Sequence, residues 1–265
     1  GQTLDKISTG KSDNKFGIPY KEAIGFFEKA SKFSNLKVSG LAVHIGSQLT
    51  DLEPFKRTFI KIAEMVAVLK NKNYNIKRLD LGGGIGISYS DGTKVIDLQE
   101  YADTIKNTLG HLDCEFEFEP GRLLVGNSGL FICSVIYFKS LENRKFLVID
   151  GAMNDLIRPA MYDAYHDVIP VTNLKSSSIF KMDIVGPVCE TSDTFCRDRN
   201  FPLAAEGDLI AFCSAGAYGA VMASEYNSRP LIPEVLVKGP KFSVIRERPT
   251  IQSIIERDIV PDWLD

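Results

Sequence analysis

The sequence predicts an α/β domain followed by an all-β domain, and three observations support this division. Strand-like and helix-like segments alternate over residues 1–126. Residues 127–265 instead carry short apolar runs separated by glycine, proline, asparagine and serine. The chain is also rich enough in apolar residues for a sizeable core, since 44% of its 265 residues are hydrophobic and 25% are charged. Alternating strands and helices indicate a parallel sheet, whereas short strands with turns between them indicate an antiparallel barrel or sandwich.

The helices of the first domain are predicted from apolar side chains that recur every three or four residues. Segments 51–72 and 97–112 both show this helical period. A third helix is expected after Pro19, because proline is common at the start of a helix. The apolar positions are Ile24, Phe27, Ala30 and Phe33 in the helix after Pro19, Phe55, Phe59, Ile62, Val66 and Leu69 in the next, and Tyr101, Ile105, Leu109 and Leu112 in the last.

The strands expected before and after these helices are segments 5–10, 36–46, 74–86 and 114–122. With the helices they make about four β/α units, whereas a closed (β/α)₈ barrel has eight strands and about 250 residues. We therefore predict the C-terminal half of a (β/α)₈ barrel over residues 1–126. An antiparallel β-barrel or sandwich domain is predicted over residues 127–265, and it closes with a short helix within 250–265.

Composition argues against several classes of protein. The net charge is −3 with acids and bases interspersed, so no basic stripe is available for a nucleic-acid backbone. No apolar run reaches the ~18 to 20 residues of a transmembrane helix, which indicates a soluble protein. The five cysteines are scattered and form no CxxC pair, a pattern typical of reduced thiols in the cytoplasm. We expect neither a disulfide framework nor a metal site.

Polar residues follow each of the last three predicted strands of the first domain. His44 closes one strand, the glycines Gly82–Gly84 close the next, and Glu119 and Arg122 close the third. In β/α barrels the active site gathers at the C-terminal ends of the strands. We therefore expect these residues to lie at one edge of the sheet and to form a binding site there.

Three consecutive glycines after a strand can bring several backbone N–H groups close to a phosphate. A plain flexible turn is the alternative, and the position at a strand end favours the phosphate. The segment LGGGIGIS does not match GxGxxG, so a dinucleotide-binding fold is a weak interpretation. Near His44, Ser47 could bond a phosphate while the imidazole stacks on a flat ring, although a lone histidine is more often structural.

The strand that ends at Glu119 alternates glutamate and phenylalanine. A period of two places Glu115, Glu117 and Glu119 on one face, where clustered carboxylates repel and at least one is expected to meet a cation. Glu119 lies nearest the rim, because Pro120 ends the strand. A carboxylate there could hold the nitrogen of a pyridine ring protonated and keep the ring an electron sink. A solvated or salt-bridged strand face is the alternative.

The second domain offers a smaller set of candidates. Cys189 and Glu190 place a thiol beside a carboxylate. The thiol is either a proton donor or, as is usual for a buried cysteine, inert packing. Arg158 and Tyr162 could bind the carboxylate of a substrate, and so could Tyr218. The alternative for these three is an ordinary surface position.

Taken together, these segments resemble the fold-type III, alanine racemase-like decarboxylases that depend on pyridoxal 5'-phosphate, and among them the diaminopimelate decarboxylases. The segments HIGSQ, LDLGGGIGI and EPGR are similar to those of ornithine and arginine decarboxylases as well. RPAMYDAYHDVIPV and GAYGAVMASEYNSRP resemble the diaminopimelate enzymes much more particularly. The resemblance runs along nearly the whole chain.

The resemblance implies that the cofactor is pyridoxal 5'-phosphate. His44 would stack on the ring and count with Cys189 among the catalytic residues, while Ser47 would hold the phosphate. Glu119 would pair with the ring nitrogen. The other cofactor-binding residues that the resemblance implies are Gly82, Gly83, Gly84, Pro120, Gly121, Arg122 and Tyr218.

The implied activity is decarboxylation of meso-2,6-diaminopimelate to L-lysine and CO₂, the last step of lysine biosynthesis. Cys189 or a nearby acid would reprotonate the carbon that loses CO₂. A distal carboxylate calls for arginine, whose fork of N–H donors binds it in bidentate fashion, and Glu190 would receive the distal ammonium. In this family Cys189 and Glu190 reach the site from the neighbouring subunit, which implies a homodimer. The implied substrate-binding residues are Arg122, Arg158, Tyr162, Glu190 and Tyr218.

The family's Schiff-base lysine lies in a segment resembling Tyr-Ala-Val-Lys-Ala-Asn, and no lysine of this sequence has that context. We therefore expect a C-terminal fragment that binds pyridoxal phosphate weakly and has no activity by itself. Two alternatives remain open. One is another fold-type III decarboxylase, acting on arginine or carboxynorspermidine, and the other is a non-catalytic relative of the family.

Overall fold

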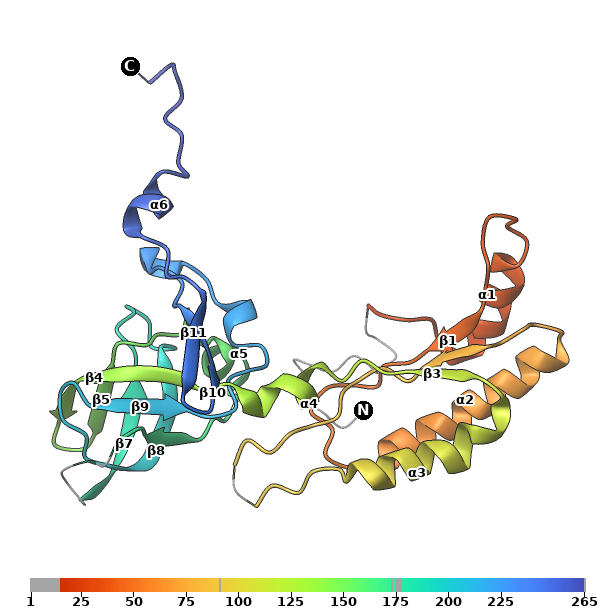
Figure 1. Cartoon of the computed structure of the whole chain (residues 1–265), viewed down its shortest axis with the longest axis horizontal. Helices are drawn as coiled ribbons and strands as arrows, with labels where there is room; N and C mark the ends of the chain where they lie inside the picture. The colour runs from red at the N-terminus through yellow and green to blue at the C-terminus, as the bar shows by residue number, and fades with distance from the viewer. Residues whose placement is uncertain (1–14, 91, 173, 175–177, 265) are drawn as a thin grey trace. The chain divides into compact units, whose positions relative to one another are not determined.

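The computed structural model describes residues 15–90, 92–172, 174 and 178–264. The chain divides into two compact units, residues 1–127 and 128–265, and each is described by itself (Figure 1). Among the described residues, no helix combines the length and the apolar character needed to cross a bilayer.

The described residues of the first unit form a three-stranded parallel sheet with helices between its strands. The sheet has the order β1-β2-β3, and its register aligns Leu41 with Leu79 and Leu79 with Phe116. The elements are η2 (Tyr20–Glu22), α1 (Ala23–Ala30), β1 (Gly40–Ala42), α2 (Glu53–Asn71), β2 (Arg78–Asp80), α3 (Leu98–Leu109), η3 (Gly110–Leu112), β3 (Glu115–Glu117), α4 (Gly121–Val125) and η4 (Gly126–Ser128), the last of which runs into the second unit.

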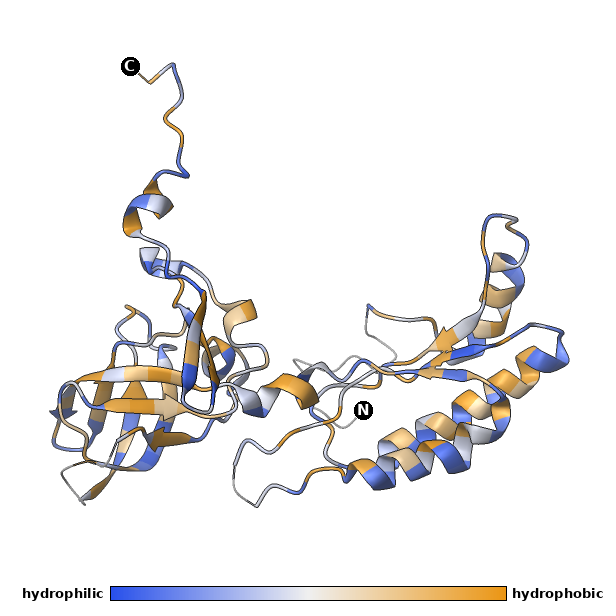
Figure 2. Ribbon diagram, viewed as in Figure 1, coloured by the Kyte–Doolittle hydropathy of each residue, from blue (hydrophilic) through white to orange (hydrophobic). Residues whose placement is uncertain are grey.

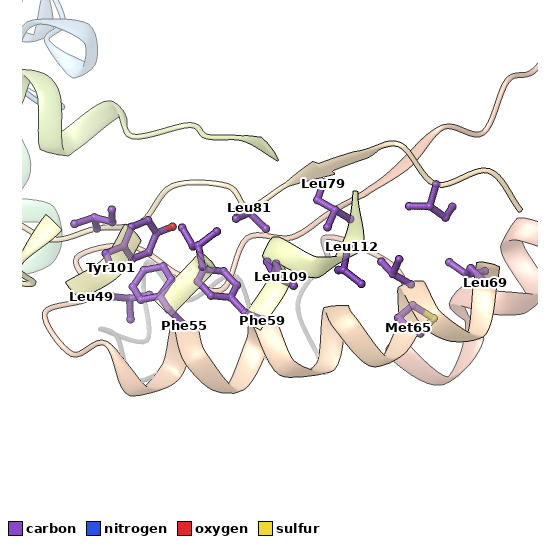
Figure 3. Close-up of a cluster of buried hydrophobic side chains, with 14 of the residues drawn as sticks. Leu49, Phe55, Phe59, Met65, Leu69, Leu79, Leu81, Tyr101, Leu109 and Leu112 are labelled. Carbon is purple, nitrogen blue, oxygen red and sulfur yellow. The ribbon is translucent and has the colours of Figure 1, made fainter. Parts of the chain in front are cut away.

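Helices α2 and α3 lie side by side along one face of this sheet, and apolar and polar residues alternate around each helix (Figures 1 and 2). Their apolar sides form the core with the middle of the sheet, where Leu69, Leu79 and Leu109 are wholly buried (Figure 3). Val66 of α2 is also wholly buried in this core. The helical period of segments 51–72 and 97–112 therefore places the expected side chains in the core.

Local chemistry explains where these helices begin. Pro54 occupies the first turn of α2, where its missing N–H removes no helical hydrogen bond. At α3 the carboxylate of Asp97 accepts hydrogen bonds from the backbone nitrogens of Gln99 and Glu100, at 2.8 and 3.0 Å, and so caps the helix.

Two expectations for the first unit need comment. The strand expected at 5–10 lies outside the described residues. Phe33 was expected to extend the apolar face of the first helix, but α1 ends at Ala30 and the Phe33 side chain is 57% exposed. That expectation was wrong, because a period carries information only as far as the helix continues. Phe27 on the same helix is buried.

The second unit contains a six-stranded sheet and a separate hairpin. The six strands have the order β6-β9-β4-β5-β7-β8, and β10 pairs with β11. The elements are β4 (Phe131–Ser140), β5 (Lys145–Ile149), α5 (Arg158–Tyr162), β6 (Val168–Pro170), β7 (Ile179–Val185), β8 (Thr194–Pro202), β9 (Leu209–Phe212), η5 (Ala220–Met222), η6 (Tyr226–Ser228), β10 (Glu234–Lys238), β11 (Lys241–Arg246) and the expected closing helix α6 (Ile251–Ile255).

The long strand β4 joins the two parts of the six-stranded sheet. Residues 131–134 pair with β9, and residues from Val135 onward pair with β5, with a register shift between Val135 and Tyr137. The rings of Phe131, Phe195 and Phe212 stack in the core beneath it, with 4.7 Å between the centroids of Phe195 and Phe212. Among the described residues, β5 pairs with β7 in parallel, and the other strand pairs of this sheet are antiparallel.

We predict that Leu109→Ala lowers the free energy of unfolding by about 2–5 kcal/mol, because the side chain is wholly buried between α3 and the sheet. Leu98→Ala on the same helix removes a side chain that is 52% exposed, and it should change stability by no more than about 0.5 kcal/mol. Urea denaturation of both variants measures the difference. Equal losses would contradict the core described here.

Candidate functional site

The ends of the three parallel strands meet at one edge of the first unit. Backbone hydrogen bonds continue the pairing past the strands: Val43 N donates to Asp80 O and Leu81 N to Glu117 O, both at 2.9 Å. The bond from Glu119 N to the carbonyl of Gly82, at 2.8 Å, extends it one step further. The structure thus brings the residues that follow β1, β2 and β3 together.

The triple glycine is packed rather than loose. A Cβ atom added to Gly82, Gly83 or Gly84 would come within 3.0 Å of the backbone oxygen of Val43, Glu119 or Gly46, respectively, and real Cβ atoms essentially never approach so closely. Gly82 and Gly84 also have φ values of +67° and +91°, which disfavour any side chain. The glycines therefore let the segments after the three strands pack backbone to backbone.

The three glycine N–H groups are not equivalent, although the sequence pattern treats them alike. Gly82 N donates to Oδ1 of Asp80 at 2.8 Å, and Gly83 N points to Nδ1 of His44 at 3.5 Å. Within the described part of the chain, the N–H of Gly84 makes no hydrogen bond. Gly84 is therefore the glycine best suited to donate to an anion.

His44 lies against this glycine turn and is exposed on its other side. An imidazole in that position can present its face to a flat ligand while its edge contacts the backbone. Ser47, three residues further on, is half-buried, and its hydroxyl accepts a hydrogen bond from Nη2 of Arg122 at 3.1 Å. His44 and Ser47 follow β1, while Arg122 follows β3, so the contact joins two strand ends.

Arg122 is held in a defined position. Its side chain is only 8% exposed and belongs to α4, which begins directly after Glu119 and Pro120. Nη1 of Arg122 donates to the hydroxyl of Tyr89, and the guanidinium carbon lies 5.8 Å from the centre of the Tyr89 ring. Sequence reasoning missed Tyr89, whose one signal was its position five residues after the triple glycine.

The glutamates of β3 have different surroundings. Glu117 forms an ion pair with Arg78, so a cation does meet one member of the carboxylate cluster, as expected. Glu119 is exposed, and in the described part of the chain no ion pair involves it. The salt-bridged interpretation therefore holds for Glu117, whereas the carboxylate of Glu119 remains available to a ligand at the rim.

In the second unit, Arg158 and Tyr162 lie one helical turn apart on α5. The Arg158 side chain is 7% exposed, so the interpretation of this residue as ordinary surface was wrong. Its Nη1 lies 2.7 Å from Nε2 of His166. Tyr162 is half-buried, and Tyr218 is 43% exposed in a left-handed conformation with φ of +58°.

Cys189 and Glu190 are both exposed, which removes the interpretation of Cys189 as a buried packing residue. Glu190 accepts hydrogen bonds from the hydroxyl of Tyr226 and from that of Ser192, the latter at 3.0 Å. These two bonds, with the Tyr226 bond first, lower the pKa of Glu190. By contrast, burial raises the pKa of the Cys196 thiol to about 11.

The loop that carries Cys189 and Glu190 is fixed by a buried carboxylate that sequence reasoning missed. Oδ2 of Asp193 accepts a hydrogen bond from Val188 N at 2.6 Å, and Oδ1 accepts one from Met153 N at 2.7 Å. The Asp193 side chain is 2% exposed, and burial raises its pKa despite these two bonds. The carboxylate therefore ties two loops together at the base of residues 189–190.

No described group of three or more histidine, cysteine, aspartate or glutamate side chains has the arrangement of a metal site. The chemistry available in the first unit is instead that of an anion site beside an imidazole and a carboxylate. In the second unit it is that of a buried guanidinium and of an exposed thiol next to an ionised carboxylate.

Comparison with known proteins shows which class of protein this chain resembles. Residues 1–126 match the family model described as the pyridoxal binding domain of pyridoxal-dependent decarboxylases. The chain is thus similar to the pyridoxal-dependent decarboxylases of fold type III. The predicted fold class, part of a (β/α)₈ barrel followed by a β domain, is thereby confirmed. Pyridoxal phosphate, the predicted cofactor, is that of the family.

The similar proteins include diaminopimelate decarboxylases, as the sequence motifs predicted. The enzyme of Zymomonas mobilis is 44% identical over 99% of this chain, and that of Aquifex aeolicus is 40% identical over 96%. The crystal structure of diaminopimelate decarboxylase from Helicobacter pylori complexed with L-lysine is 41% identical, with a TM-score of 0.91 over 97% of this chain. The chain spans 60–63% of the length of these three relatives.

We predict that Gly83→Ala destabilises the first unit by about 1–3 kcal/mol, because the added Cβ would collide with the backbone oxygen of Glu119 and force two strand ends apart. Gly25→Ala in α1 is the matched control. A Cβ at Gly25 meets nothing within 4 Å, and alanine should stabilise the helix by up to about 1 kcal/mol. Thermal denaturation compares the two, and unchanged stability of Gly83→Ala would contradict the close backbone packing.

Proposed function

We propose that these 265 residues form part of a pyridoxal-phosphate-dependent decarboxylase that converts meso-2,6-diaminopimelate to L-lysine and CO₂. The observation that carries the proposal is the edge where β1, β2 and β3 end. Ser47, Gly84 and Arg122 converge there beside an exposed imidazole and an exposed carboxylate. The similarity to diaminopimelate decarboxylases over nearly the whole chain gives the specific activity.

The residues at this edge fit pyridoxal phosphate. A phosphate needs several N–H or O–H donors close together, and the N–H of Gly84, the hydroxyl of Ser47 and the guanidinium of Arg122 provide them. A Cβ on any glycine of the turn would collide with the backbone of the segments after β1 or β3, so the glycines let Gly84 lie close to the segment that carries Ser47. His44 would stack on the ring, and Pro120 and Gly121 would keep Glu119 and Arg122 at the rim.

Bound at this edge, the cofactor would supply an electron sink for the electron pair that the departing CO₂ leaves behind. Glu119 would hold a proton on the ring nitrogen, which strengthens that sink. Cys189, whose thiol is exposed, would return a proton to the carbon. The lysine that binds the cofactor in the family would come from a segment outside these residues.

The second unit would bind the part of the substrate that does not react. Arg158 is suited to a carboxylate, because a guanidinium presents planar, paired donors. Tyr162 would assist from the next turn of α5, and Tyr218 would contact both cofactor and substrate. Tyr226 and Ser192 favour the ionised form of Glu190, which would therefore attract the distal ammonium.

Two further statements belong to the proposal. We expect a homodimer in which Cys189 and Glu190 of one subunit serve the site of the other, since both side chains are exposed at the tip of a fixed loop. We also place the enzyme in the cytoplasm, because the sequence carries five scattered cysteines without a disulfide framework.

A substrate panel tests the activity directly. The holoenzyme that contains these residues should release CO₂ from meso-diaminopimelate with a kcat/KM at least about 10²-fold above those for ornithine, arginine and carboxynorspermidine. The reason is that Arg158 and Glu190 match a distal end that carries both a carboxylate and an ammonium. Preference for arginine or carboxynorspermidine would replace the proposed substrate. Absence of any turnover by a holoenzyme with bound cofactor would favour a non-catalytic relative.

We predict that Glu119→Gln lowers kcat for meso-diaminopimelate by about 10²- to 10³-fold, because a neutral amide cannot hold the ring nitrogen protonated. Glu115→Gln removes the same charge from the first residue of β3 and should leave kcat within about twofold. Steady-state CO₂ release from both variants measures the effect. An equal response of the two variants would argue against a role for Glu119 at the cofactor.

A further inference from the structure

His166 is the most buried histidine of the chain, and nothing in the proposed chemistry uses it. Its side chain is 1% exposed, whereas His44 and His111 are exposed. It lies beyond the end of α5, between that helix and β6. Both of its ring nitrogens are within hydrogen-bond distance of another group: Nδ1 is 2.8 Å from the carbonyl oxygen of Cys213, and Nε2 is 2.7 Å from Nη1 of Arg158.

The chemistry of these two neighbours fixes the state of the imidazole. A carbonyl oxygen can only accept, so Nδ1 of His166 must carry the proton. A guanidinium nitrogen can only donate, so Nε2 must offer its lone pair to Arg158. His166 is therefore neutral, in a single tautomer, and it is the acceptor of this hydrogen bond.

His166 is itself held in place from two directions. Its backbone oxygen accepts a hydrogen bond from Nη2 of Arg199 at 3.2 Å, and the same guanidinium binds Asp167 at 3.1 Å and lies 4.3 Å from the ring centre of Tyr165. Directly after β9, Cys213 N donates to the backbone oxygen of Asp167 at 2.8 Å. The imidazole thus projects from a segment that is anchored to two strands.

By contrast, Arg158 projects from α5, a helix of only five residues. Long arginine side chains lose considerable rotamer freedom when they are fixed. Because a guanidinium is planar, a hydrogen bond that fixes Nη1 also restricts the orientation of the whole group. The anchored imidazole therefore restricts the plane in which Arg158 presents its donors.

We propose that His166 is a positioning residue that orients Arg158 for recognition of the substrate's distal carboxylate. This inference rests on the proposed function, which assigns that carboxylate to Arg158. His166 would not touch the substrate. It would act by accepting the hydrogen bond from Nη1 of Arg158.

L-lysine and cadaverine provide a specific test. They share two amino groups on a five-carbon chain, and only L-lysine carries a carboxylate. Loss of carboxylate recognition should weaken binding of L-lysine and leave that of cadaverine nearly unchanged. General damage to the fold should weaken both. The measurement is the dissociation constant of each ligand for the cofactor-loaded enzyme, obtained by titration calorimetry.

Two conservative variants separate the two hydrogen bonds of His166. In His166→Asn the amide nitrogen replaces Nδ1, so the bond to Cys213 can form but the side chain no longer reaches Arg158. In His166→Gln the longer side chain places an amide oxygen near the position of Nε2, where it can still accept from Arg158. We expect His166→Asn to raise the dissociation constant of L-lysine by about tenfold and that of cadaverine by less than about twofold. His166→Gln should keep most of the affinity for L-lysine.

Controls distinguish failure of this inference from failure of the proposed function. His111→Asn changes an exposed histidine of η3 and should affect neither ligand. Arg158→Gln should weaken the binding of L-lysine but not that of cadaverine. Adding His166→Asn to this variant should cause no further selective loss of affinity for L-lysine. If Arg158→Gln does not act selectively, the assignment of the carboxylate to Arg158 is wrong. If it does but His166→Asn weakens both ligands equally or neither, His166 does not position Arg158.

Discussion

Backbone-to-backbone packing at the ends of three parallel strands is the constraint on which the first unit depends. Pairing of β1, β2 and β3 in parallel makes their carboxyl ends emerge together, and the glycines at 82–84 let the following segments approach without side chains between them. His44, Ser47 and Arg122 take their positions from this packing. A single methyl group at Gly83 would collide with the backbone of Glu119 and push the segments after β2 and β3 apart.

In the second unit, charged side chains fix the loops around the candidate residues. Asp193 joins two loops through backbone N–H groups, and Arg199 joins the segment at 165–167 to β8. The side chains of Asp193 and Arg199 are largely buried, and a buried charge without hydrogen-bond partners would destabilise the fold. Their hydrogen bonds are therefore formed as part of folding, and the exposed residues Cys189 and Glu190 lie on a framework that they do not themselves hold together.

Much of this arrangement was accessible from the sequence, because periodicity and strand-end position are local signals. The helical period placed Leu69 and Leu109 in the core, and the motifs at 44–47, 82–84 and 119–122 indicated the pyridoxal-dependent decarboxylases that residues 1–126 match. Contacts between distant segments left no comparable signal. The hydrogen bonds of Tyr89 with Arg122 and of Met153 with Asp193 join segments that are distant in the sequence. The parallel pairing of β5 with β7 likewise depends on the tertiary fold. Phe33 shows that helical periodicity does not predict where a helix ends, since the apolar spacing continues past Ala30, the last residue of α1.

The hydrogen bonds that the Asp193 carboxylate accepts have a consequence for how proteins of this kind can diverge. The carboxylate binds main-chain nitrogens at positions 153 and 188, and the turn itself is closed by main-chain bonds from Glu190 N to Val188 O and from Asp193 N to Glu190 O. None of these bonds involves the side chains at the tip. Mutation at 189 or 190 can therefore alter the chemistry presented there while the path of the loop is inherited unchanged, so that new specificities can arise without a new fold.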